Sequence, residues 1–514
     1  MVTNNRPLPP IADLFCRIPI FQLTSVARPS GMGLSRVGVP TPDEILGVVP
    51  QSLTVRSESR VAKGCGDYLS VPFAAMASIN WREKQMNRAE SSRRNTMPRR
   101  ALLGGLLLSA CCLASTATVR AEIGPNGVVY IESNTPDNHI LGFRLNDAGK
   151  LVPLPGSPYS MGGAGTNPDS LTAAGLGPFD SDQNMVRHGD RIFAVNSGSD
   201  TVAVFDIRRN GSLSPVHGSP FPSGGVNPVS VGVSGNTLVV VNKDYDLGRP
   251  GFMNALRRPN YTTFRITPRG QLNPIPNGTI VADDTGGMGF GHANPTQALV
   301  TTNGHVVIDA NFIGLMIRSF TLGHNGRLIP ADAQMLPPSE SPTAGNPFQM
   351  PVPLGLQVHP KANVFYVGLV LDRKFAVYNY DPKNGHFSFV RAVTGTENAL
   401  VGPCWFVINR AGTRMYAANN FNNSISVYSV DDPRNPIALQ TIPLSQGLKM
   451  GAPFQMAIDA SGHHLFVVTQ TAGNGQPNGN SLQALTIESN GLLTLLDNVI
   501  LPTAPSRPQG AVSR

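Results

Sequence analysis

The chain is poor in charge, in cysteine and in long apolar runs. Only 14% of its 514 residues are charged and five are cysteines. Four of the cysteines lie at or before residue 112, so Cys404 stands alone in the rest of the chain and no disulfide can form there. We expect Cys404 to be a small buried apolar residue. No spacing typical of metal ligands involves a cysteine. We therefore expect neither a disulfide scaffold nor a metal or other cofactor.

A sustained excess of positive charge is also missing. The formal net charge is +8, but 15 of the 40 basic residues and 7 of the 32 acidic residues lie in 1–121. The remaining sequence therefore carries 25 residues of each sign and is neutral. This balance removes the support that a basic chain would give to a nucleic-acid or anionic-membrane role.

An export signal interrupts the amino-terminal region. The segment "MPRRALLGGLLLSACCLASTATVRAEIG" (97–124) has two arginines, a short apolar stretch over 101–114 and small residues before Glu122. The stretch is too short for a normal membrane-spanning helix, and this pattern is typical of a secretory signal over 97–121. "RRALL" resembles a twin-arginine signal, and Leu108–Cys111 resembles a lipobox that would place a lipid anchor on Cys111. We expect a periplasmic or extracellular protein.

Residues 1–96 show no sustained periodicity. A signal must be amino-terminal to act, so we expect translation to begin at Met86 or Met97 and the upstream stretch to be a mis-called start. A disordered extension is the alternative. The segment 122–514 then forms the folded domain.

Abundant turn formers, 53 Gly and 45 Pro, favour an all-β protein with many corners. From residue 125 onward, one arrangement of strand, polar corner and alternating strand recurs seven times. These hairpins are predicted at 128–145, 191–207, 237–266, 305–322, 363–381, 413–430 and 464–487. A turn containing Gly, such as "RRNGSL" (208–213), follows in most units and marks a tight hairpin to a further strand.

Each unit is followed by a linker and a strand that begins near a proline, such as "NPVSVGV" (227–233) and "APFQMAI" (452–458). The same pattern predicts such a strand at "NPDSLTA" (167–173). The first unit lacks a proline-headed strand of its own, whereas the chain ends with an unpaired one, "RPQGAV" (507–512). We therefore predict a seven-bladed β-propeller with four antiparallel strands per blade, in which the carboxyl-terminal strand closes blade 1. An array of β-sandwiches is the competing fold, but it predicts no such leftover strand.

The repeated phrases carry a family resemblance. "RIFAVNSGSDTVAVFDI" (191–207) and "RMYAANNFNNSISVYSV" (414–430) resemble YVTN-type blades, and 125–514 as a whole resembles the lactonase family of seven-bladed propellers. That family includes 6-phosphogluconolactonases and 3-carboxymuconate cyclases. The resemblance implies a polar cluster on one face, with a His, an Arg and a Glu in characteristic segments.

This sequence departs from that cluster. "GHANPTQALV" (291–300) keeps His292, but Gly314 or Leu315 stands where the family pattern places Arg. Gly368 and Leu369 stand at the Glu corner. Opening a lactone requires a base to activate water and a cation or donor for the developing oxyanion.

We therefore take His292 as the candidate catalytic base and Arg257 and Arg258 as candidate anion anchors. Asp309 and Asn311 complete the candidate substrate-binding set. The alternative reading makes His292 an ordinary loop histidine and the two arginines a solvated surface pair.

Two functions remain open. The first is an exported enzyme that hydrolyses or isomerises a small lactone-type acid. The second is a non-catalytic propeller that binds a surface protein or polysaccharide, which the missing Arg and Glu favour. In either case we expect no nucleic-acid partner, and contact with a membrane only through the anchor at Cys111.

Overall fold

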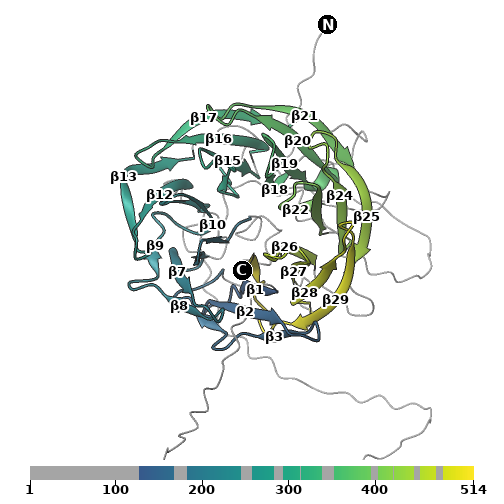
Figure 1. The fold of residues 1–514 in the computed structure, drawn as a ribbon. Helices are drawn as coiled ribbons and strands as arrows, with labels where there is room; N and C mark the ends of the chain where they lie inside the picture. The colour runs from purple at the N-terminus through teal and green to yellow at the C-terminus, as the bar shows by residue number, and fades with distance from the viewer. Residues whose placement is uncertain are drawn as a thin grey trace, which may run out of the picture. The chain divides into compact units, whose positions relative to one another are not determined.

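The computed structural model describes residues 127–166, 182–244, 258–282, 293–312, 314–337, 352–394, 403–420, 422–444, 452–470 and 479–514. The predicted amino-terminal extension and signal lie outside these ranges. Within them the chain forms thirty strands and one 3₁₀ turn, η2 (Val370–Asp372). The strands build seven antiparallel sheets around a central axis, one blade after another (Figure 1). The described residues contain no helix long and apolar enough to cross a membrane.

Blades 1 and 2 have interrupted outer edges. In each, a short fifth strand joins the sheet beside a short outer strand. Blade 1 contains β1 (Val128–Glu132), β2 (His139–Leu145), β3 (Leu151–Pro153) and β4 (Tyr159–Ser160). Blade 2 contains β5 (Met185–His188), β6 (Arg191–Asn196), β7 (Thr201–Ile207), β8 (Leu213–Pro215) and β9 (Phe221–Pro222).

Blades 3 to 7 each have four strands in sequence order, from the inner strand to the outer one. Blade 3 contains β10 (Pro228–Ser234), β11 (Thr237–Asn242), β12 (Asn260–Ile266) and β13 (Leu272–Val281). Blade 4 contains β14 (Leu299–Val300), β15 (Val306–Asn311), β16 (Met316–Leu322) and β17 (Leu328–Met335). Blade 5 contains β18 (Pro353–Val358), β19 (Val364–Leu369), β20 (Lys374–Tyr380) and β21 (Phe387–Thr394). Blade 6 contains β22 (Pro403–Ile408), β23 (Arg414–Asn419), β24 (Ser424–Ser429) and β25 (Ile437–Pro443). Blade 7 contains β26 (Ala452–Ile458), β27 (His464–Gln470), β28 (Ser481–Ile487) and β29 (Leu493–Ile500).

The last strand closes the ring, as the sequence predicts. β30 (Gln509–Ser513) pairs antiparallel with β1 and becomes the inner strand of blade 1. The pairing contains a bulge, because Ile131 lies opposite Ala511 whereas Glu132 lies opposite Gln509. The carboxyl terminus therefore lies within the ring of blades (Figure 1).

One predicted inner strand is misplaced. The inner strand of blade 2 is β5, which begins at Met185, and it has no proline at its start. The segment 167–173 lies outside the described residues. The prediction failed because it required a proline at the head of every inner strand, and blade 2 does not follow that rule.

Because the inner strands run in one direction, the ring has two distinct faces. The upper face is defined as the one on which the inner strands begin, for example at Pro228 and Ala452. The second strands end there, and the third strands begin there. The lower face carries the turns between first and second strands and between third and fourth strands.

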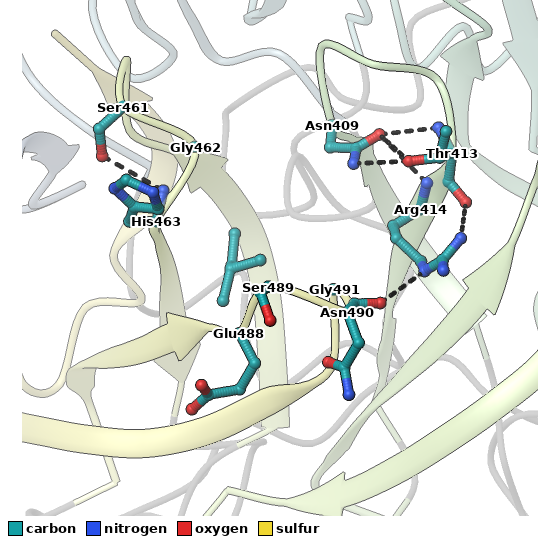
Figure 2. Close-up of a pocket in the computed structure, with 11 residues that line it drawn as sticks. Asn409, Thr413, Arg414, Ser461, Gly462, His463, Glu488, Ser489, Asn490 and Gly491 are labelled. Carbon is teal, nitrogen blue, oxygen red and sulfur yellow. Dashed lines mark hydrogen bonds between the residues drawn. The ribbon is translucent and has the colours of Figure 1, made fainter.

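On the lower face, side chains of one blade bind turn carbonyls of the next. Arg414 Nε donates to Asn490 O at 3.0 Å, which joins blade 6 to blade 7 (Figure 2). Arg191 Nη2 donates to Pro268 O at 2.7 Å, and Tyr366 Oη donates to Pro433 O at 2.9 Å. Arg514, the last residue, donates to the carbonyls of Arg208 and Arg209 in blade 2. These bonds satisfy polar groups that would otherwise lie between adjacent sheets.

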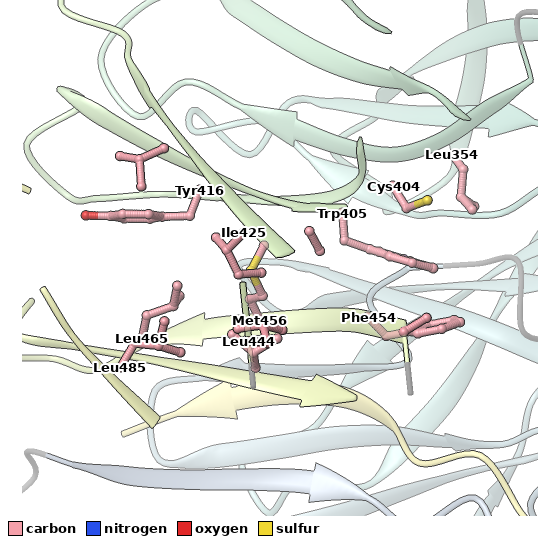
Figure 3. Close-up of a cluster of buried hydrophobic side chains, with 14 of the residues drawn as sticks. Leu354, Cys404, Trp405, Tyr416, Ile425, Leu444, Phe454, Met456, Leu465 and Leu485 are labelled. Atoms are coloured by element: carbon pink, nitrogen blue, oxygen red, sulfur yellow. The ribbon is translucent and has the colours of Figure 1, made fainter. Parts of the chain in front are cut away.

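The core lies between neighbouring sheets, which pack face to face around the ring. In the cluster between blades 6 and 7, Trp405 stacks on Phe454 with ring centroids 4.2 Å apart (Figure 3). Cys404 is buried beside Trp405, as predicted. The inner strands approach closely at Gly355, where a Cβ atom would lie 1.8 Å from Cys404 O, so only glycine fits this position.

Candidate functional site

The predicted site residues fall partly within the described chain. His292 and Arg257 lie outside it. Arg258 is exposed and lies two residues before Asn260, the first residue of β12, on the upper face. Asp309 and Asn311 both lie on β15 and are fully buried. The described residues therefore place two of the candidate substrate ligands inside blade 4.

Asp309 is held by neutral donors from two blades. Tyr261 Oη, from β12 of blade 3, donates to Asp309 Oδ2 at 2.6 Å. The backbone amides of Thr296 and Gln297 donate to Asp309 Oδ1 at 3.0 and 3.1 Å. Each carboxyl oxygen thus has at least one donor, as a buried carboxyl requires.

Two cations lie near this carboxyl. Burial raises the pKa of Asp309 to about 7, although its hydrogen bonds and the charge of Lys243 act in the opposite direction. Arg318 lies opposite Asp309 in the pairing of β15 with β16, and its charge acts on Tyr261. Burial, followed by the charge of Asp309, raises the pKa of Tyr261 well above 10. Asp309, Tyr261, Lys243 and Arg318 form what we call the Asp309 cluster.

Asn311 occupies a position that repeats around the ring. Its Oδ1 accepts the backbone amides of Asn294 and Gly314, which fixes the entry to blade 4 and the turn after β15. The last residue of the second strand is an amide in five blades, and these residues are Asn196, Asn242, Asn311, Asn419 and Gln470. Blade 5 has Leu369 at this position and blade 1 has Glu132.

Glu132 is therefore the carboxyl in a ring of amides. Its side chain is 2% exposed, and Oε1 accepts Asn138 Nδ2 at 2.8 Å. Within the described residues, Oε2 has no hydrogen-bond partner. Burial raises the pKa of Glu132 to about 8, against the opposing effect of the Asn138 bond.

Amide side chains also join the blades across the axis. Gln297 Nε2 donates to Gln183 Oε1 at 2.8 Å and to Leu356 O at 2.9 Å, while its Oε1 accepts Leu356 N at 2.7 Å. Asn184 continues the network, because it donates to Gln509 and accepts from Gln455, each at 3.3 Å. Beside Asn184, burial raises the pKa of Asp182 to about 7. Blades 1, 2, 4, 5 and 7 are thus connected at the upper ends of their inner strands.

Sequence reasoning missed this network. A signal was present, because glutamine recurs near the start of four inner strands, in "SDQNMV", "NPTQAL", "APFQMA" and "RPQGAV". The prediction used prolines to find the inner strands, which located three of these four segments but not "SDQNMV", and it gave no role to the glutamines.

The upper face also holds buried polar atoms that lack a hydrogen bond within the described chain. Apart from Glu132 Oε2, these include amide atoms of Asn134, Asn227, Asn242, Asn294, Asn419, Asn423 and Gln470 and the hydroxyls of Thr166 and Ser506. All of these residues belong to strand ends or connections on the upper face. Buried groups without partners are rare in proteins and need an explanation, such as a bound molecule or a catalytic role.

The lower face has a cavity of about 260 Å³ between blades 6 and 7. Figure 2 shows that it is bordered by the turns that carry Ser461, His463 and Glu488, with Arg414 on the opposite side. Arg414 is already engaged by Asn490 O, Thr413 O and Asp431. This cavity is polar, but none of the buried side-chain atoms without a hydrogen bond in the described chain belongs to its lining, so the upper face is the better candidate site.

The described residues contain no group of three or more His, Cys, Asp or Glu side chains placed to hold a metal ion. The buried side chains gathered on the upper face include carboxyls, amides and hydroxyls, with Lys243 close to Asp309. Such groups suit proton transfer and the recognition of a polar organic molecule.

Comparisons with known proteins agree with this fold. Residues 354–497 match the model of a family described as lactonase, 7-bladed beta-propeller. A comparison with curated proteins found no match. Among solved structures, a candidate 6-phosphogluconolactonase from Bacteroides uniformis is similar, with a TM-score of 0.55 and 17% identity. That match covers 75% of this chain and 99% of the other.

A periplasmic gluconolactonase from Pseudomonas aeruginosa has the same TM-score of 0.55 at 13% identity, over 75% of this chain and 98% of the other. A protein from Lactobacillus plantarum is also similar, with a TM-score of 0.52 and 14% identity, over 73% of this chain and 99% of the other. At such identities the structural matches establish the fold alone. The seven closed blades confirm the predicted seven-bladed β-propeller, and blades 5 to 7 are similar to the lactonase family model.

Proposed function

We propose that the protein hydrolyses or isomerises a small lactone-type acid at its upper face. One observation carries the proposal: three buried carboxyls, Glu132, Asp182 and Asp309, gather on that face, and burial raises the pKa of each into the range of about 7 to 8. Groups that exchange protons near neutral pH are what acid–base catalysis needs, and such shifts concentrate at functional sites.

In the proposed reaction, His292 acts as the base that activates water or removes a proton. Arg257 or Arg258 and upper-face amides would stabilise the negative charge that develops on the lactone oxygen. Asp309 is engaged by Tyr261 and two backbone amides, so we assign it a positioning role toward Thr296 and Gln297. Asn311 positions the turn after β15 in the same way.

The charge of the site favours an uncharged lactone over a sugar phosphate. Lys243 and Arg318 are buried beside Asp309 and Tyr261, so they are not presented to a phosphate dianion, which would have to lose its hydration without a buried cation to pair with. The export signal predicted over 97–121 points the same way, because sugar phosphates belong to the cytoplasm. The likeness to a periplasmic gluconolactonase supports a periplasmic or extracellular location, with Cys111 as an alternative lipid anchor.

The test is turnover by the exported full chain, isolated from its host and sequenced from its amino terminus. Acid release would be followed in a pH-stat with gluconolactone, its 6-phosphate and a carboxymuconolactone. We expect the uncharged lactone to react fastest and His292→Ala to lose at least about 100-fold in kcat/KM, the usual contribution of a general base. His324→Ala, on an exposed lower-face turn, is the matched control. Activity that survives His292→Ala would refute the assignment of the base.

A second function has its own support. Gly368 and Leu369, at the corner where the family pattern has Glu, are buried in β19 and pair with β18. An apolar strand end cannot supply that carboxylate. If no lactone in the panel is turned over, the alternative is a propeller that binds a surface protein or polysaccharide through the same face.

A further inference from the structure

Glu132 differs from the residues at equivalent positions in ways that affect the closure of the ring. Asn196 Nδ2 donates to Met161 O at 3.3 Å, and Gln470 Nε2 donates to Pro508 O at 2.8 Å. The amide at this position is thus a hydrogen-bond donor to neighbouring chain segments. A carboxylate cannot donate, and a carboxyl can donate only through its proton.

The surroundings of Glu132 disfavour its charged form. Its neighbours are the amides of Asn138 and Gln509 and the backbone of Ile140 in β2. The titratable groups of the adjoining turn, Asp137 and His139, contact each other at 3.7 Å. Arg507, which precedes β30, is not among the causes of the shift in the pKa of Glu132. Burial dominates that shift and raises the pKa to about 8.

The same residue lies at the point where the chain closes on itself. Glu132 is opposite Gln509, the first residue of β30, and the bulge in the β1–β30 pairing falls there. Gln509 accepts from Asn184 of blade 2, and Gly510 N donates to Gln455 Oε1 of blade 7 at 3.2 Å. Hydrogen bonds at Gln509, the partner of Glu132, and at the next residue, Gly510, therefore join the start of β30 to both neighbouring blades.

We propose that Glu132 is a proton-operated latch on the closure of the propeller. With its proton, the carboxyl is neutral and tolerates burial beside Gln509. Without the proton, a buried charge stands beside the junction of β1 and β30, and Oε2 has no donor among the described residues to compensate it. Loss of the proton therefore loosens the closing strand and, through Asn184 and Gln455, the upper face to which it is tied.

The direction of the pH effect follows from linkage. The folded form holds a proton on Glu132 that the unfolded chain releases near pH 4.5. The contribution to folding stability is thus complete below about pH 4.5 and is lost as the pH rises to about 8. The latch is closed in acid and open in mild alkali. Asp182 titrates in an overlapping range, so its effect must be separated from that of Glu132.

The test compares wild type, Glu132→Gln and the exposed lower-face control Glu488→Gln in urea unfolding of the full chain at pH 5 and pH 9. The Gln variant carries the neutral donor that Gln470 provides in blade 7. We expect it to match wild type at pH 5 and to have an unfolding equilibrium constant about 10²–10³-fold lower at pH 9, as a shift of several pKa units implies. The same comparison in an Asp182→Asn background removes the overlapping titration. An equal effect of Glu132→Gln at both pH values, or none at pH 9, overturns the latch.

Hydrogen exchange on the wild-type chain gives a second readout that does not require the variant to fold. After correction for the chemical exchange rate, β30 (509–513) should lose protection between pH 6 and pH 9 relative to β21 (387–394). Unchanged relative protection of β30 would contradict the proposal.

Discussion

The two faces of the ring treat their carboxyl groups in opposite ways. On the upper face, burial raises the pKa of Glu132, Asp182 and Asp309. On the lower face, burial also acts on Asp459, but hydrogen bonds from His464 and Ser461 outweigh it and lower its pKa to about 2. The upper-face carboxyls are more deeply buried, whereas Asp459 combines less burial with several donors and the neighbouring charge of His464.

This difference in the pKa values of the carboxyls corresponds to two roles of the sheets, one on each face. Lower-face side chains bind the turn of the next blade and so hold neighbouring sheets together. Upper-face polar groups are buried with fewer partners among the described residues, which costs stability and preserves reactivity. We therefore expect substitutions on the upper face to have larger effects that depend on pH in the neutral range.

The largest expected effect is at Gln297. Replacement by alanine leaves Leu356 N and Leu356 O without partners and frees Gln183 Oε1. We expect a loss of about 3 kcal/mol in the free energy of unfolding, since each buried group left unpaired costs about 1–3 kcal/mol. Urea unfolding measures it. The matched control is Gln357→Ala on inner strand β18, whose amide donates to the adjacent Val358 O rather than to another blade. Equal losses at the two sites would remove the special role of the central network.

Tyr261→Phe should come next. It removes the donor to Asp309 Oδ2 and should cost about 2 kcal/mol above pH 7, where the carboxyl is charged. Below pH 6 the carboxyl of Asp309 is protonated and depends less on the hydroxyl of Tyr261, so the loss in the free energy of unfolding should be smaller. Thermal unfolding at pH 5.5 and pH 8.5 measures both. The comparison variant is Tyr366→Phe on the lower face, whose hydroxyl donates to the neutral Pro433 O. A cost at Tyr261 that does not change with pH would show that Asp309 does not titrate there.

Asp459→Asn should show the reverse pH dependence. The folded pKa is lowered, so the carboxylate stabilises the fold above about pH 4, and this contribution disappears as the pH falls toward 2. We expect a loss of about 1–2 kcal/mol at pH 7, little loss near pH 2, and hence a variant that is less sensitive to acid. Acid titration of the circular dichroism signal measures this. Asp206→Asn, at an exposed partner of Arg191, is the control.

The smallest expected effect is at Arg414. Arg414→Gln removes the bonds to Asn490 O and Asp431 on the partly exposed lower face. We expect about 0.5–1 kcal/mol, decreasing with added salt, because partly exposed ion pairs contribute little. Arg208→Gln, whose guanidinium binds Ser214 within its own blade, controls for loss of surface charge. A cost above that of Gln297→Ala would reverse the proposed difference between the faces.

The fold was predictable because its signals are local. Each hairpin lies within a few dozen residues, and turns such as that at Gly211, with φ +80°, are marked by glycine. The closure was also predictable, because the first unit lacks an inner strand of its own and the sequence has an unpaired strand near its carboxyl-terminal end. The exception at β5 arose where one blade lacks the local proline signal.

The candidate site was less predictable because its contacts are distant in sequence. Gln297 and Gln183 are 114 residues apart, and Asn184 and Gln509 are 325 apart. The sequence around Glu132 does not indicate that this carboxyl is buried. Only the structure shows that it ends β1 at the position where five other blades carry an amide. Asp309 was selected as a ligand from a family pattern, whereas its neighbours Tyr261 and Lys243 become visible only when blades 3 and 4 lie side by side.

The position of β30 has a consequence for the life of the chain. The partner of β1 lies at the opposite end of the described chain, so any fragment that stops before Gln509 leaves the edge of β1 unpaired. Such a fragment presents an open strand edge to other chains and is expected to aggregate. Extensions fused directly after Arg514 would also crowd the turn at Arg208 and Arg209, so affinity tags belong elsewhere.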